Sequence, residues 1–144
     1  MIRIVIDTNI IVSALLQPRG PPAQVYSLVC GGSIQLCVSG QVYAEYEEVI
    51  RRPRFRRDEA VITAALDTIR ERGLWVKPKE TVRECADPDD DIFLECAQAA
   101  RAAYLVTGNL KHFPAAWLGT RILTARNFLE IMAGETEPEI LDDD

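Results

Sequence analysis

The sequence lacks several features that would assign it to a specialised class of protein. No run of apolar residues approaches the ~18 residues that a membrane-spanning helix needs. The N-terminus shows neither the basic segment nor the cleavage site of a secretory signal. The four cysteines form no CxxC motif and are accompanied by no histidine pair, which disfavours a zinc site or a disulfide framework. We therefore expect a cytoplasmic protein with no membrane association.

The composition is that of an ordinary globular domain. The chain has 144 residues, of which 48% are hydrophobic and 26% are charged. This length accommodates one domain, and this hydrophobic fraction can build a real core. No repeat or internal linker divides the sequence. We expect one domain over residues 1–133 and a flexible acidic tail over residues 134–144.

Charge is distributed unevenly along the chain. The formal net charge is −6, from 22 acidic and 16 basic residues, and six of the acids lie between Glu135 and Asp144. The rest of the chain is therefore neutral, and the acidic balance does not exclude a polyanionic partner. Five bases crowd into residues 51–57, a patch that could contact phosphates. They are Arg51, Arg52, Arg54, Arg56 and Arg57.

Short apolar runs alternate with amphipathic segments along the chain. The runs predict strands at residues 2–6, 34–38, 74–76, 104–107 and 122–124, with the third at an edge. Helices are expected at residues 9–16, 23–30, 40–51, 59–73, 87–103 and 125–132. Ser39 and Asp58 are suitable caps for two of these helices. The alternation predicts an α/β fold with a mostly parallel sheet and helices on both faces.

Ligands of such sheets bind beyond the carboxyl ends of the strands, so acids at those positions are candidates for a site. Asp7 directly follows the first predicted strand, although it could simply cap the next helix. After the second strand, Glu45 and Glu47 flank the apolar stripe of the helix, while Glu48 points away. Helical periodicity does not choose between the first two, but Glu45 lies nearer the helix start and is favoured.

Four acids occur within five positions at residues 87–91. Asp87 could cap a helix, Pro88 could occupy its first turn, and the remaining acids could complement the helix dipole. A bound divalent cation would neutralise the cluster more completely. Asp90 aligns with the edge of the core and is the favoured functional acid. Asp91 aligns with the polar face of the helix, and it and Asp87 are second choices.

Asn109 follows the fourth predicted strand and presents an amide oxygen at the same edge, unless it is an ordinary turn residue. Together with Asp7, Glu45 and Asp90 it would line one cleft. Oxygen ligands of this kind suit Mg²⁺ or Mn²⁺, which can activate a water and hold a phosphodiester oxygen. The single histidine, His112, could act as a base nearby, but a surface loop position is favoured.

The sequence resembles the PIN-domain family, in particular its prokaryotic toxin components of toxin–antitoxin pairs. The matching segments are Val5–Asn9, Ser39 with Glu45, Asp87–Ala97 and Leu105–Asn109, in family order. The resemblance implies a Rossmann-like three-layer α/β/α fold and Mg²⁺- or Mn²⁺-dependent ribonuclease chemistry. It implies metal ligation by Asp7, Glu45 and Asp90. It assigns supporting roles to Thr8, Asn9, Ser39 and Thr107.

One position departs from the family pattern. Many members have an aspartate where this chain has Asn109, and the substitution removes a negative charge from the site. Two readings follow: an endoribonuclease, the toxin of a type II pair, or a weakly active or inactive PIN module that binds RNA or protein. A small-molecule phosphohydrolase is a third, disfavoured because no phosphate-cradling glycine loop follows the first strand.

The partners expected from this reading are an RNA substrate and a cognate antitoxin. A homodimer is also expected, because the loop at residues 17–22 and the helices at residues 23–30 and 42–50 carry more apolar surface than a small sheet needs to cover.

Overall fold

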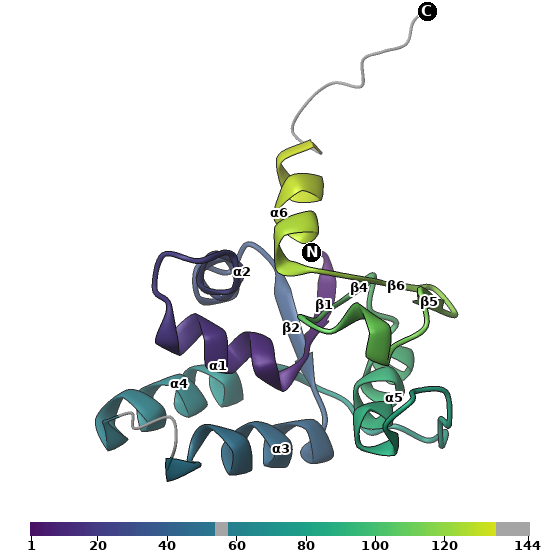
Figure 1. The fold of residues 1–144 in the computed structure, drawn as a ribbon, viewed down its shortest axis with the longest axis horizontal. Helices are drawn as coiled ribbons and strands as arrows, with labels where there is room; N and C mark the ends of the chain where they lie inside the picture. Colours follow the sequence, from purple (N-terminus) through teal and green to yellow (C-terminus); the bar gives the residue numbers. More distant parts are fainter. Residues whose placement is uncertain (54–57, 135–144) are drawn as a thin grey trace, which may run out of the picture.

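The structure is a computed structural model that describes residues 1–53 and 58–134. Its centre is a six-stranded sheet, and helices lie on both sides of the strands (Figure 1). The strands are β1 (Arg3–Ile6), β2 (Gln35–Val38), β3 (Leu74–Trp75), β4 (Tyr104–Val106), β5 (Ala116–Trp117) and β6 (Thr120–Leu123). They follow the order β3-β2-β1-β4-β6-β5, and only the β5–β6 pair is antiparallel. The predicted α/β fold with a mostly parallel sheet is confirmed.

The strand register brings the carboxyl ends of the central strands to one level. Ile6 of β1 pairs with Val106 of β4, and Val106 pairs with Leu123 of β6. On the other side, Val38 at the end of β2 pairs with Trp75 of β3. The residues that follow these strands therefore emerge at one edge of the sheet.

The helices connect these strands and cover the sheet. They are α1 (Thr8–Leu16), α2 (Pro21–Cys30), α3 (Gly40–Ile50), α4 (Glu59–Arg72), α5 (Asp91–Ala100) and α6 (Ala125–Gly134), with 3₁₀ turns η2 (Pro88–Asp90) and η3 (Leu110–His112). Ser39 Oγ accepts a hydrogen bond from Val42 N at 3.2 Å, and Asp58 Oδ1 accepts one from Ala60 N at 3.2 Å. Both predicted caps are confirmed.

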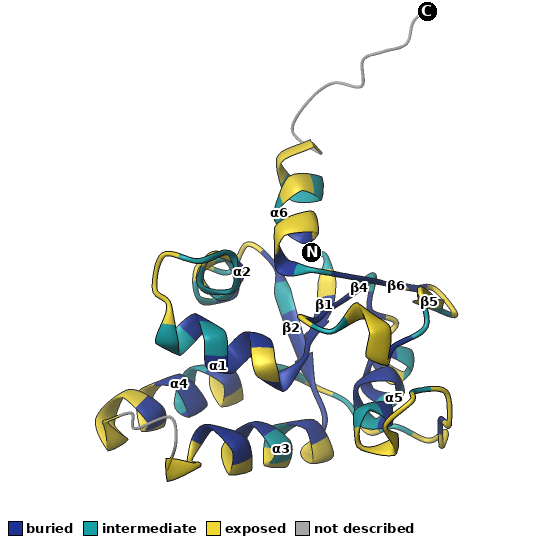
Figure 2. Cartoon of the chain, in the orientation of Figure 1, coloured by how far each residue is buried: buried dark blue, intermediate teal, exposed yellow. Residues whose placement is uncertain are grey.

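The central strands are buried on both faces, as parallel strands between helices should be (Figure 2). Tyr46 of α3 is the largest fully buried side chain, and its hydroxyl donates a short hydrogen bond to the carbonyl of Ile6. This bond ties α3 to the end of β1. It is one reason why residues of α3 and the residue after β1 have fixed relative positions.

Three details of the predicted elements are wrong. The short strand β5 is missing from the predicted strands, because its two residues give no periodic signal. Helix α2 begins at Pro21 rather than at residue 23, because proline is well suited to the first helical turn. Helix α5 ends at Ala100 rather than near residue 103, because Arg101 adopts a left-handed conformation with φ 53°.

The apolar surface on which the homodimer was expected is not found on the predicted segments. Within residues 1–53 and 58–134, the large hydrophobic side chains that are exposed are Met1, Val61, Trp75, Leu110 and Leu118. None of these lies in α2 or α3. The same ranges contain no helix both long and apolar enough to cross a bilayer. All four cysteines are free, with Cys37 and Cys96 buried.

Gly73, between α4 and β3, offers a test of how closely these elements pack. A Cβ at Gly73 would lie 2.7 Å from the carbonyl oxygen of Ile69 and 2.9 Å from a methyl of Val38. We expect Gly73→Ala to lower the free energy of unfolding by roughly 1–3 kcal/mol in urea titrations. Gly40→Ala is the control, since its Cβ would meet nothing within 4 Å and its stability should stay the same or rise slightly. An unchanged Gly73→Ala variant would contradict the described packing.

Candidate active site

Asp7 is buried at the carboxyl end of β1. Its backbone N–H donates to the carbonyl of Val106 at 2.9 Å, which continues the pairing with β4. The residue occupies the N-cap position of α1 but its side chain makes no capping hydrogen bond. Instead, Thr107 Oγ1 donates to Asp7 Oδ2 at 2.7 Å. Its carboxylate is thus held by the segment after the neighbouring strand β4, while the backbone N–H groups of Asn9 and Thr8 at the start of α1 also lower its pKa.

Thr107 also connects Asp7 to Asn109. The Thr107 hydroxyl is fully buried and accepts a hydrogen bond from Asn109 N at 3.0 Å. Asn109 then begins η3 and lines a shallow pocket of about 390 Å³. The pocket is bordered by Gly108, Asn109, Leu110, Lys111, His112 and Thr124. The segment after β4 thus positions both a buried carboxylate and an open surface beside it.

Glu45 reaches the same region from α3. Burial raises the pKa of its carboxyl, the nearby Thr8 hydroxyl lowers it, and the charges of Glu48 and Asp7 raise it further. Thr8 Oγ1 is itself buried and completes no hydrogen bond within the described residues, so its contact with Glu45 is loose. Glu45 is half-buried, whereas Glu48 is exposed as expected.

Asp90 is the acid whose pKa is most clearly perturbed at this edge. Its side chain is 19% exposed, and burial together with the charges of Asp7 and Asp87 raises its pKa to about 6. His112 acts in the opposite direction, with Nδ1 at 3.4 Å from Asp90 Oδ2. This contact falls outside hydrogen-bond geometry, and Asp90 Oδ2 is buried with no hydrogen-bond partner in residues 1–53 and 58–134. An unpartnered buried carboxylate oxygen is costly and is typical of a site awaiting a ligand.

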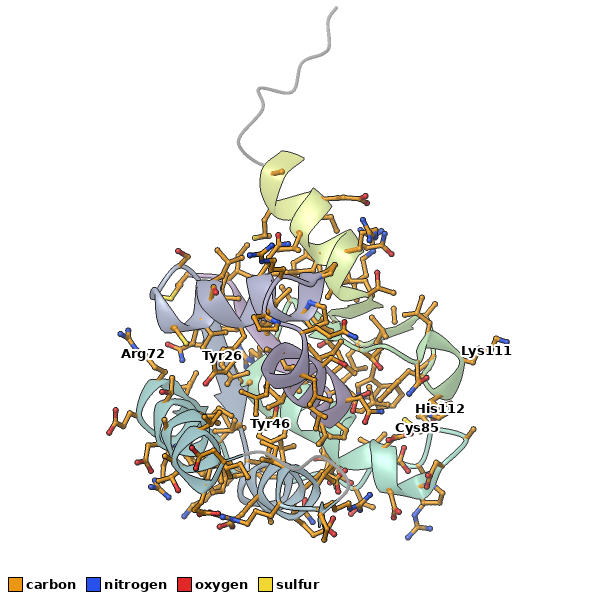
Figure 3. All side chains as sticks on the ribbon, turned by 60° about the vertical axis from the view of Figure 1, so that its left-hand side comes forward. Tyr26, Tyr46, Arg72, Cys85, Lys111 and His112 are labelled. Atoms are coloured by element: carbon orange, nitrogen blue, oxygen red, sulfur yellow. The ribbon has the colours of Figure 1, made fainter. Side chains whose placement is uncertain are left out.

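His112 lies closer to the candidate site than the sequence predicts for a surface loop residue. It is half-exposed in η3, as a surface residue would be, yet it faces Asp90. Figure 3 shows His112 and Lys111 at the margin of the molecule, far from the central Tyr46. The sequence feature that could have indicated this position is the short separation between His112 and the end of β4. His112 lies in η3, which follows β4 at the edge of the sheet that also carries Asp7.

Asp91 does not lie on a solvent-facing polar surface, as the helical pattern suggested. It is 6% exposed, and its Oδ1 accepts hydrogen bonds from the backbone N–H groups of Glu84 and Cys85 at 3.1 and 2.8 Å. Glu95, one turn along the same face, accepts from Val82 N at 3.0 Å. This polar face therefore anchors the irregular segment 76–87. Asp87 accepts from Asp89 N and caps η2, as the capping alternative predicted.

Asp7 is electrostatically coupled to Glu45 and to Asp90, which lie on separate elements. Asp7 raises the pKa of both Glu45 and Asp90, and burial raises the pKa of Asp7 itself, partly offset by the Thr107 hydroxyl. In the described ranges, no three His, Cys, Asp or Glu side chains already converge closely enough to hold a metal ion. The donor chemistry nevertheless fits a hard divalent cation, because all donors are oxygens and one is orphaned.

Only part of the basic patch is described. Arg51 Nη1 lies 2.6 Å from Glu59 Oε2, and Arg52 Nη2 lies 2.8 Å from Glu48 Oε1. Both pairs are exposed, so they contribute little to stability and could exchange for phosphate. The other three arginines, Arg54, Arg56 and Arg57, lie outside the described residues, as does most of the tail.

Comparison with known proteins agrees with this architecture. The PIN domain family model matches residues 3–111, and the chain belongs to this family. An uncharacterised protein of Methanocaldococcus jannaschii is 28% identical over 111 residues, covering 75% of this chain and 71% of that protein. A crystal structure of VapBC2 from Rickettsia felis bound to a DNA fragment from their promoter aligns with a TM-score of 0.54. The alignment covers 85% of this chain and 97% of that chain at 18% identity, and it shows a shared fold.

The repulsion around Asp90 predicts a pH-dependent gain in stability for Asp90→Asn. Because the folded-state pKa of about 6 lies above the ordinary 3.8, the associated stability is present below about pH 4 and lost as the pH rises through 6. The Asp90→Asn variant does not lose this stability, because its amide does not ionise. Urea unfolding should show it more stable than the parent by about 1 kcal/mol at pH 7.5, with a smaller difference at pH 4.5.

Asp89→Asn is the matched control, because Asp89 is exposed and adjacent in sequence. It should show no comparable pH dependence. A destabilised Asp90→Asn variant whose deficit is the same at both pH values would contradict the electrostatic account.

Proposed function

We propose that the protein is a metal-dependent endoribonuclease that hydrolyses RNA phosphodiester bonds. The observation that carries this proposal is that Asp7 raises the pKa of both Glu45 and Asp90, and that Asp90 Oδ2 is buried with no hydrogen-bond partner among the described residues. Asp7 repels both other acids, His112 and Thr107 offset this only in part, and a divalent cation would relieve the remaining repulsion. Membership of the PIN-domain family supports the same reading.

Asp7, Glu45 and Asp90 would hold Mg²⁺ or Mn²⁺, which supplies Lewis-acid activation of a water and charge stabilisation at the phosphate. Thr107 fixes the Asp7 carboxylate by its 2.7 Å hydrogen bond. Ser39 caps α3 and so sets the position of Glu45 at the strand ends. Asn109 would offer a neutral amide oxygen. Thr8 and Asn9 form the start of α1 directly after Asp7. The arginines of residues 51–57 would contact RNA phosphates.

The biological setting proposed is that of a cytoplasmic toxin neutralised by a cognate antitoxin. The support is the sequence resemblance to toxin components and the shared fold with VapBC2 of Rickettsia felis. A homodimer remains part of the proposal, although the described surface does not supply the apolar patch first expected for it.

A second function, an RNA- or protein-binding PIN module with little or no turnover, is favoured by one observation. Asn109 gives the site one negative charge fewer than an aspartate would. In addition, the acids of the described residues do not already form a cluster of metal ligands. Both features weaken cation binding. Calorimetric titration with Mn²⁺ distinguishes the two functions. Absence of binding at millimolar concentration would favour the binding module.

The nuclease proposal predicts that Asp7→Asn and Asp90→Asn each abolish Mn²⁺-dependent cleavage of a single-stranded RNA. Each change removes a charged ligand while preserving side-chain shape, so circular dichroism should show an intact fold. Asp89→Asn and Glu47→Gln are exposed neighbours of Asp90 and Glu45 and should cleave at the parent rate. Undiminished cleavage by both active-site variants would reject the assignment.

Asn109→Asp provides a gain-of-binding test. A fourth carboxylate at the pocket would strengthen attraction for the cation, and we expect calorimetric titration to show Mn²⁺ binding about tenfold tighter than in the parent. Equal or weaker binding would place Asn109 outside the ligand sphere of the metal.

A further inference from the structure

An exposed aromatic cluster lies at the open edge of the sheet, away from the acids. Trp75 of β3 is 44% exposed, which is high for so large an apolar side chain. Its ring lies 5.4 Å from that of Tyr43 on α3, centroid to centroid, at an interplanar angle of 48°. The guanidinium of Arg70 on α4 sits 5.8 Å from the centre of the Tyr43 ring. Three elements thus contribute to one surface cluster.

The cluster is held rigidly by its own polar groups. Trp75 Nε1 donates to the carbonyl of Arg70 at 3.1 Å, and Arg70 Nη1 donates to the Tyr43 hydroxyl at 3.1 Å. Arg70 Nη2 also donates to Asp67 at 2.5 Å. The indole N–H is satisfied internally, and what Trp75 still offers to solvent is ring surface.

The location connects this surface to the proposed active site. Trp75 pairs with Val38, and β2 pairs with β1, so the cluster stands at the same carboxyl edge as Asp7. The two lie two inter-strand spacings apart, roughly 10 Å across the sheet. A single strand that occupies about 4–16 nucleotides of a binding site, as is typical of single-strand binding folds, is long enough to reach from the acids to Trp75.

Basic side chains flank Trp75 along the chain; Arg70 is paired with Asp67, and Lys77 and Lys79 border a pocket together with Glu80 and Glu95. Residues 70–79 contain four basic side chains and a single acid, Glu71. The basic residues are Arg70, Arg72, Lys77 and Lys79. Exposed aromatic faces beside cations are the combination with which proteins bind single-stranded nucleic acid, because every base has a π face and every linkage a phosphate.

From this juxtaposition we infer that Trp75, supported by Tyr43 and Arg70, is a stacking platform for a base of single-stranded RNA that extends beyond the cleavage site. The inference rests on the proposed function for its substrate class. It assigns Trp75 a binding role and no part in the chemical step. Because stacking is largely indifferent to base identity, the platform contributes affinity and placement of the strand more than sequence preference.

The chain offers an internal control, since its second tryptophan, Trp117, lies in β5 with its indole N–H donating to Gln98. Two single-tryptophan proteins, Trp117→Phe and Trp75→Phe, each report from one position. A ten-nucleotide oligouridine is titrated into the full chain with chelator present, so that metal-dependent cleavage does not occur. We expect quenching of Trp75 fluorescence and little change at Trp117. An abasic oligomer of equal length should leave Trp75 unquenched.

Affinity measured by fluorescence anisotropy of labelled oligouridine provides the second readout. Trp75→Leu keeps apolar bulk but removes the π face, and should weaken binding by roughly 5- to 150-fold. Trp75→Phe should recover part of that loss, which a merely structural role for bulk would not explain. Val61→Ala, an exposed apolar truncation on α4, should bind as the parent does.

Each result decides one question. Quenching of Trp75 that depends on bases supports the platform even if the protein never cleaves RNA, in which case only the proposed function fails. Cleavage of RNA with no quenching of Trp75 and full affinity of Trp75→Leu overturns the platform and leaves the nuclease intact. Equal quenching by the abasic oligomer, or no binding of either oligomer, also overturns it. Altered oligomeric state of Trp75→Leu with unchanged RNA affinity would assign the surface to a protein partner instead.

Discussion

Like-charge repulsion among carboxylates at one edge of the sheet is the constraint on which the rest of the site depends. Asp7 is fixed by β1–β4 pairing and by the hydroxyl of Thr107, and Asp90 is fixed at the start of α5. Asp7 cannot turn away into solvent without breaking its hydrogen bond with Thr107. Burial and mutual charge raise the pKa of both carboxyls, and no described cation side chain neutralises them except the half-exposed His112. The fold therefore maintains a local excess of negative charge at a cost in stability.

Several contacts hold the elements that carry these acids in place. Parallel strands, the Tyr46–Ile6 hydrogen bond and the polar face of α5 each lock an element that carries an acid. Asp91 is instructive, because it lies beside Asp90 and is fully committed to backbone N–H groups of segment 76–87. Of two adjacent aspartates, one is satisfied by the protein and the other is left with an orphaned oxygen. Asp91 therefore has a structural role, and Asp90 retains an oxygen free for the metal-binding role proposed for it.

Much of this arrangement could be predicted from the sequence. Alternating strands and helices indicated the parallel sheet, and acids placed directly after strands indicated the edge where they meet. The choice of Glu45 over Glu48 and of Asp90 over its neighbours followed from helical facing. The polar face of α5 could not be interpreted in the same way, because a polar stripe appears identical whether it faces water or the N–H groups of a loop. The two-residue strands β3 and β5 are defined by tertiary contacts, and the cluster of Trp75, Tyr43 and Arg70 joins residues up to 32 positions apart through such contacts.

The central claim is that Asp7, Glu45 and Asp90 form a single cation site despite their separation along the chain. Anomalous diffraction from crystals soaked in Mn²⁺ tests this most directly. The account predicts a manganese peak within ligating distance of Asp7 and Asp90, with Glu45 contacting the ion directly or through water. A fully soaked crystal with no peak between these carboxylates, or with manganese bound only elsewhere, would contradict it.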